Sequence, residues 1–67
     1  MSYNLVSVIK TARAERRLSV YALSKQTGIS TSHLYAIEAG KKSPSLDVLE
    51  KILRRLGLRL EVVADVR

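Results

Sequence analysis

The stretch LSVYALSKQTGISTSHLYAIEAG, residues 18–40, contains two short helical patterns joined by one tight turn. Ser19 and Ser30 are each placed to cap a helix start, because a serine oxygen accepts a backbone N–H that has no partner within the helix. Gly28 ends the first pattern, since glycine readily adopts the left-handed backbone that closes many helices, and Gly40 ends the second. The spacing predicts a helix-turn-helix whose two helices cover 19–27 and 30–39.

Further helical patterns flank this unit on both sides. Before it, apolar residues recur at helical spacing from about Asn4 or Leu5 to Arg17, and Asn4 is placed to cap the start. After it, Pro44 keeps the chain extended, and Ser45 is placed to cap a helix of sequence LDVLEKILRRL that Gly57 ends. The apolar stripes of these two helices consist of Leu5, Val8, Ile9 and Ala12, and of Leu46, Leu49, Ile52, Leu53 and Leu56.

The last segment, LRLEVVADVR, abandons helical spacing and alternates apolar with polar residues, as a half-buried strand does. A lone strand leaves its backbone N–H and C=O groups unpaired, so it needs a second strand. The N-terminal YNLVSVI is an internal candidate, although its own spacing favours a helix. We therefore predict that two copies of the chain pair their last strands in a two-fold dimer. The predicted dimerisation residues are Leu58, Leu60, Val62, Ala64 and Val66.

The 67 residues are enough for one domain with a thin core, because chains of this size bury only about 60% of their unfolded surface. The sequence predicts an all-α fold of four helices over 4–56 and the dimerising strand over 57–67. There is no Cys and only one His, so neither disulfides nor a metal cluster is expected to stabilise it. Oligomerisation is the remaining way to stabilise so small a domain.

Twelve Lys and Arg against six Asp and Glu give a net charge of +6. In so small a domain this excess favours a polyanionic partner, with nucleic acid ahead of an anionic membrane. The three tyrosines are the only aromatic residues, which disfavours RNA and single strands. No apolar run approaches the ~20 residues that span a bilayer, and no signal peptide opens the chain. We expect a cytoplasmic protein without cofactor or small-molecule ligand.

The helix predicted over 30–39 has an unusual outer face. On a helical wheel Leu34 and Ile37 form its inner face, flanked by Ser30 and Glu38. The opposite face carries only short side chains: Ser32, Ala36 and Ala39, bordered by His33 and Tyr35. An ordinary exposed face gains from long charged residues, so this face is shaped for something that approaches the backbone closely.

Glu38 lies beside these inward residues, and a buried carboxylate needs a partner. Arg13, one helical turn after Ile9, is the best candidate in the first helix. We predict that Arg13 and Glu38 form a structural ion pair, not a catalytic one.

The pattern LSVYALSKQTGISTSHLYAIEAGKKSPSLDVLEKILRRLGL resembles the Cro/CI-type helix-turn-helix family, also called the XRE family. The resemblance covers about 40 residues of the chain and includes Arg13, which matches the arginine that pairs with the Glu38 position. It rests on these residues: Leu18, Ser19, Leu23, Gly28, Ile29, Ser30, Leu34, Ile37, Glu38, Gly40, Pro44, Ser45, Leu49, Ile52, Leu56 and Gly57. The resemblance implies a small all-α domain whose third helix enters the DNA major groove.

By this resemblance, Thr31, Ser32 and Ala36 match the base-contacting positions, and His33 and Tyr35 lie beside them. A lone surface histidine such as His33 is usually an ordinary hydrogen-bonding group. Tyr35 either packs on a neighbouring helix or donates to a phosphate. The family often places Gln or Asn on this face, and neither is present here. Because Ser and Thr suit several bases, the operator sequence does not follow from these residues.

Phosphate contacts are expected around this face. Lys41 and Lys42 are the main candidates, with simple solvation as the alternative, and Arg17 and Lys25 are weaker ones. Backbone N–H groups at helix starts, near Val20 and Thr31, suit phosphates whatever their side chains.

We predict a sequence-specific double-stranded DNA-binding protein, a dimeric transcriptional repressor. It is not expected to be an enzyme, because no nucleophile with a base, phosphate-binding Gly loop or paired carboxylates stands out. The alternative is an antitoxin, since the short helix-turn-helix followed by LRLEVVAD is similar to HipB-type antitoxins, which bind DNA and also neutralise a toxin protein.

Overall fold

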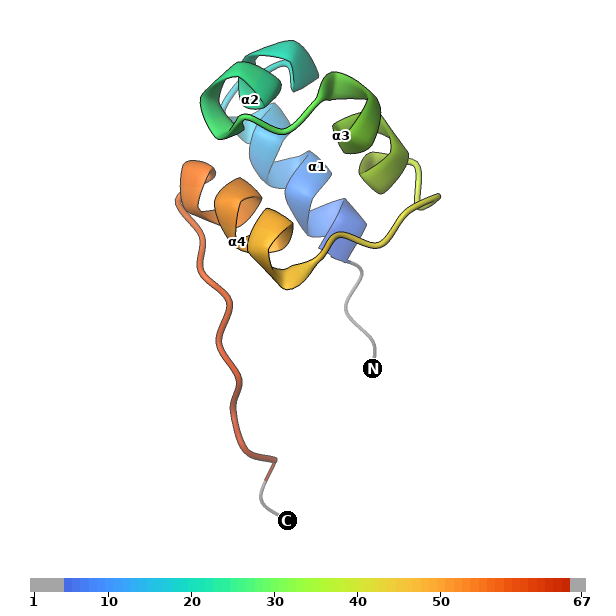
Figure 1. The fold of residues 1–67 in the computed structure, drawn as a ribbon. Coiled ribbons are helices and arrows are strands. Elements are labelled where there is room, and N and C mark those ends of the chain that lie inside the picture. Colours follow the sequence, from blue (N-terminus) through green and yellow to red (C-terminus); the bar gives the residue numbers. More distant parts are fainter. Residues whose placement is uncertain (1–4, 66–67) are drawn as a thin grey trace.

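The computed structural model describes residues 5–65. Its helices are α1 (Leu5–Glu15), α2 (Val20–Thr27), α3 (Thr31–Glu38) and α4 (Leu46–Arg55). Helix α2 packs against both α3 and α4, and α1 packs against α3, so the helices surround one core (Figure 1). The predicted all-α class is confirmed. No helix within the described range is long and apolar enough to cross a membrane.

Serine side chains start three of the helices, as the sequence predicts. The Oγ atoms of Ser19, Ser30 and Ser45 accept backbone N–H groups three residues later, at 3.0, 3.1 and 3.2 Å respectively. Each cap satisfies one of the N–H groups that have no acceptor inside the helix. The predicted cap of the first helix, Asn4, lies outside the described residues.

The end of α1 differs from the prediction. The helix stops at Glu15, and Arg17 adopts a left-handed backbone with φ 51°. The N–H of Leu18 donates to the carbonyl of Arg13 at 3.0 Å, and the N–H of Arg17 donates to the carbonyl of Ala14 at 2.9 Å. This is the Schellman pattern, which usually has glycine at the left-handed position. The helix ends there even without a glycine, because these bonds satisfy its last carbonyls.

The core contains apolar side chains from all four helices and from the turn between α2 and α3. Its buried members are Ile9, Ala12, Val20, Leu23, Ile29, Leu34, Ile37, Leu49, Ile52, Leu53 and Leu56. Three members of the predicted stripes do not belong to it: Val8 is only partly buried, Leu46 is 60% exposed and Leu5 is 38% exposed. Leu5 and Leu46 are the first residues of their helices, where the packed face has not yet begun. Val48 packs against the core in the first turn of α4.

After α4 the chain leaves the helical body, and residues 58–65 extend away from it (Figure 1). They form no strand within this single chain. The apolar side chains here are strongly exposed: Val62 is 97% exposed and Val63 is 78% exposed. Leu58 and Leu60 are 36% and 42% exposed. The predicted pairing needs a second chain and stays a prediction, and Val66 lies outside the described residues.

Candidate nucleic-acid interface

Helix α3 presents two very different faces. Leu34 and Ile37, each 1% exposed, bury its inner face in the core. On the other side Ser32 is exposed, and Tyr35 is 62% exposed. The remaining predicted base-facing residues, Thr31, His33 and Ala36, are partly buried. The structure therefore brings all five onto one short helix, with small side chains at its exposed centre.

A bidentate ion pair holds this helix to α1. Arg13 Nε donates to Glu38 Oε2 at 2.8 Å, and a second guanidinium nitrogen donates to Glu38 Oε1 at 2.9 Å. The third nitrogen donates to the carbonyl of Leu18 at 2.9 Å, in the turn that leads into α2. One arginine thus connects the end of α1, the start of the helix-turn-helix and the end of α3.

The pair is mostly shielded from water, with side-chain exposures of 21% for Arg13 and 9% for Glu38. The hydrogen bond to Glu38 raises the pKa of Arg13 above its ordinary value, against a smaller lowering by burial. Because a raised arginine pKa stabilises the fold at every pH below the unfolded value, this contribution is constant throughout the physiological range. The ion pair is a permanent structural element, not a pH switch.

The starts of α2 and α3 present backbone N–H groups to solvent. Ser30 Oγ caps His33 N–H, which leaves the N–H groups of Thr31 and Ser32 without an acceptor inside α3. The start of α2 is similar, since Ser19 caps Ala22. The side chain of Val20 is only 5% exposed, so the backbone N–H is the group that this residue offers to a phosphate.

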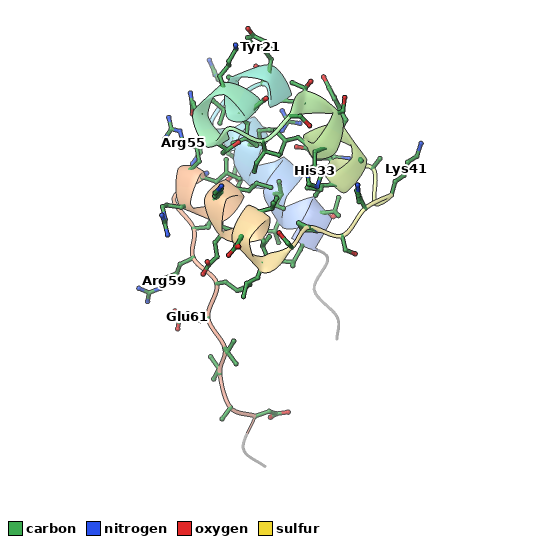
Figure 2. The ribbon with its side chains drawn as sticks, viewed as in Figure 1. Tyr21, His33, Lys41, Arg55, Arg59 and Glu61 are labelled. Carbon is green, nitrogen blue, oxygen red and sulfur yellow. The ribbon has the colours of Figure 1, made fainter. Side chains whose placement is uncertain are left out.

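The predicted phosphate-contacting cations are all exposed. Lys41 and Lys42 come after Gly40, just beyond the end of α3, and Figure 2 shows Lys41 projecting into solvent beside that helix. Arg17 lies in the turn between α1 and α2. Lys25 lies on α2, and its Nζ atom is 5.4 Å from the centroid of the Tyr21 ring.

Sequence reasoning missed Tyr21, which is 64% exposed near the start of α2. The spacing of four residues places Tyr21 and Lys25 on the same face of a helix. This spacing was the signal from which the contact could have been predicted. A cation this close to an aromatic ring is attracted by the electrons of the ring face. Because its side chain is exposed, Tyr21 adds a hydroxyl to the polar groups on the α2 surface.

Residues 9–63 match the family model described as Helix-turn-helix. An uncharacterised HTH-type transcriptional regulator of Mycobacterium tuberculosis is 33% identical over 57 residues, which are 85% of this chain and 41% of that regulator. The immunity repressor protein of Bacillus phage phi105 is 34% identical over 55 residues, covering 82% of this chain and 38% of the repressor. A regulator of Methanocaldococcus jannaschii, also HTH-type and uncharacterised, is 38% identical over 53 residues, covering 79% and 80%.

The chain therefore belongs to the helix-turn-helix family of DNA-binding transcriptional regulators, and the resemblance to the Cro/CI type is confirmed. It spans about two fifths of the length of the mycobacterial and phage relatives. The predicted similarity to HipB-type antitoxins is not shown by these relatives. No solved structure matches the chain significantly.

Proposed function

We propose that the protein binds double-stranded DNA sequence-specifically, with α3 lying in the major groove, and that it represses transcription. The observation that carries this proposal is the contrast between the two faces of α3. The inner face is fixed by Leu34, Ile37 and the Glu38 ion pair, while the outer face is short and uncharged. A helix held rigidly with short outward side chains fits a groove in which base edges approach closely.

In this proposal Thr31, Ser32 and Ala36 face the bases, with His33 and Tyr35 at the edges of the contact. Lys41, Lys42, Arg17 and Lys25 neutralise phosphates, together with the backbone N–H groups at the starts of α2 and α3. These phosphate contacts position the helix but do not read sequence. Specificity therefore depends on the few side chains of the α3 outer face.

We further propose that residues 57–67 form the dimerisation element and residues 4–56 the DNA-binding unit. The support is the exposure of Val62 and Val63 and of the neighbouring leucines. An antiparallel pairing with Val62 opposite its own copy sets Arg59 opposite Asp65. A two-fold dimer then presents two α3 helices to successive major grooves, roughly 34 Å apart, on a near-palindromic operator.

The same exposed tail suits a second candidate function, an antitoxin that binds a toxin protein through residues 58–65. This alternative rests on the exposed valines alone, since any complementary protein surface covers them as well as a second copy does. A larger protein that co-purifies with the chain and dissociates the dimer supports the alternative. Its absence favours the repressor.

Selection of bound duplexes from a random library tests the DNA-binding proposal. We expect enrichment of a near-palindromic site by the full chain, and none by the variant Ser32→Glu, which adds a negative charge to the exposed centre of α3. Ser32 is better suited to this test than Ala36, which is partly buried. If the variant enriches the same site, α3 does not contact the bases.

A chain truncated after Gly57 tests the dimer separately. Its sedimentation should be that of a monomer, and its affinity for the selected site should fall sharply because the two half-sites no longer bind as one unit. A truncated chain that remains a dimer with full affinity excludes the tail as the dimerisation element.

A further inference from the structure

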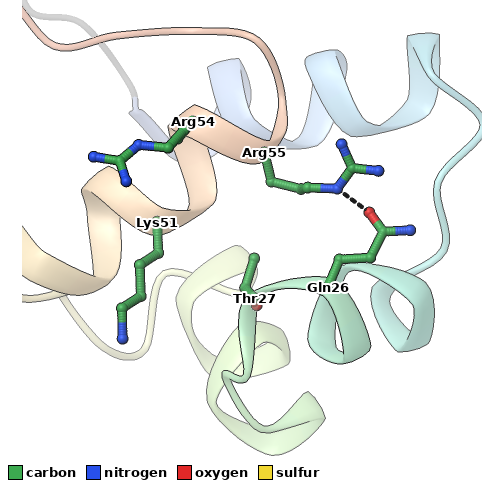
Figure 3. Close-up of a pocket in the computed structure, with 5 residues that line it drawn as sticks. All are labelled: Gln26, Thr27, Lys51, Arg54 and Arg55. Atoms are coloured by element: carbon green, nitrogen blue, oxygen red, sulfur yellow. Dashed lines mark hydrogen bonds between the residues drawn. The ribbon is translucent and has the colours of Figure 1, made fainter.

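A second basic surface lies between the end of α2 and the second half of α4 (Figure 3). It is a shallow hollow with a volume of about 420 Å³. It is lined by Gln26, Thr27, Lys51, Arg54 and Arg55. Three of these side chains are cationic and none is a carboxylate, and the function proposed above uses none of them.

The positive charge in this hollow is larger than the partial negative charges of the two helix C-termini can offset. Both α2 and α4 end at this hollow, and each helix C-terminus acts as about half a negative charge. Together they offset about one of the three cations, which leaves about two positive charges uncompensated. Asp47 and Glu50 lie one turn before Lys51 and Arg54, but within residues 5–65 neither carboxylate forms an ion pair with them.

Hydrogen-bond donors are also available. Arg55 Nε donates to the Gln26 side-chain oxygen, as Figure 3 shows. This bond fixes the guanidinium and leaves its two terminal nitrogens and the Gln26 amide nitrogen as donors. The Thr27 hydroxyl is already occupied, because it donates to the Leu23 carbonyl at 2.7 Å and accepts the Ile29 N–H at 3.3 Å. The polar groups that remain free in the hollow are therefore all donors.

We propose that this hollow binds a ligand that carries two or more phosphate groups. Arginine forks match phosphate oxygens in pairs, and the three cations spread over more space than one phosphate fills. The phosphates belong either to a free polyphosphate-type ligand or to a nucleic-acid backbone. In Figure 2 Arg55 and Lys41 lie on opposite sides of the helical body, so this site is separate from the lysines that follow α3. The inference does not depend on the proposed function.

The test is a titration of the ¹⁵N-labelled full chain with inorganic tripolyphosphate at fixed ionic strength. We expect saturable shifts concentrated at the backbone amides of residues 26–27 and 51–55. The variant Lys51→Gln with Arg54→Gln should bind about tenfold more weakly, since each exposed ion pair contributes up to about fivefold in affinity. The control Lys10→Gln with Arg16→Gln removes the same charge from α1 and the turn that follows it, and should bind as the unchanged chain does.

All four substituted side chains are exposed, so the variants should keep the melting temperature of the parent. Equal weakening by both double variants, or shifts that are scattered and do not saturate, overturns the proposal, because it shows attraction by net charge alone. A duplex without an operator identifies the source of the phosphates. Displacement of tripolyphosphate by this duplex assigns the site to a nucleic-acid backbone, and retention of tripolyphosphate assigns it to a free ligand.

Discussion

Replacing Glu38 by alanine removes the carboxylate that holds α3 to α1. Loss of one partner from a fully buried ion pair costs about 3–5 kcal/mol, because the other charge is left without compensation. Here Arg13 keeps 21% of its side chain exposed, so water partly solvates the stranded guanidinium. We therefore expect the free energy of unfolding to fall by about 2–3 kcal/mol.

In a domain of this size each kcal/mol shifts the melting temperature by about 4–8 °C, so the loss should amount to about 8–24 °C. Thermal unfolding followed by circular dichroism measures it. Glu50→Ala is the matched control: it removes the same charge from an exposed position on α4 that forms no ion pair within the described residues. The control should change the melting temperature by no more than about 2–4 °C, the equivalent of about 0.5 kcal/mol.

A second variant separates charge from packing. Arg13→Met combined with Glu38→Leu removes both charges and should recover part of the lost stability, because apolar replacements of a buried pair are often neutral. Recovery will be incomplete, since the Leu18 carbonyl loses the hydrogen bond from Arg13. Should Glu38→Ala weaken DNA binding while the melting temperature stays unchanged, the structural role argued for the pair is refuted.

Three further predictions concern the surface. Lys41→Ala with Lys42→Ala should lower affinity for every DNA sequence. The slope of log K against log salt should become smaller by about 1.8, since each phosphate contact contributes about 0.9. An unchanged slope excludes both lysines from the phosphate contacts. Ser32→Glu should abolish operator binding at an unchanged or slightly higher melting temperature, because a negative charge suits the first turn of α3; a competition assay against the parent operator measures it. Arg17→Gly should stabilise the fold by about 1 kcal/mol, as glycine adopts φ 51° without strain, and a lower melting temperature argues against strain at this position. The same variant should bind DNA more weakly if the Arg17 guanidinium contacts a phosphate.

Much of this protein follows from local sequence. Ser19, Ser30 and Ser45 mark helix starts because a capping serine acts within three residues of itself, and the structure confirms each cap. The helical period alone places the small residues of α3 together on one face of the helix.

Other features depended on tertiary contacts. The sequence suggests that Arg13 and Glu38 meet, but only the packing of α1 against α3 sets the bidentate geometry and the third bond to Leu18. The end of α1 could not be predicted from local sequence, because the left-handed position is occupied by Arg17 and not by a glycine. The two hydrogen bonds that close the helix outweigh the strain of this backbone conformation. The basic hollow joins residues about 25 positions apart, and no periodicity connects the end of α2 with α4. Helical spacing determines which face of each helix is apolar, whereas the crossing of the helices decides which charges from distant segments lie together.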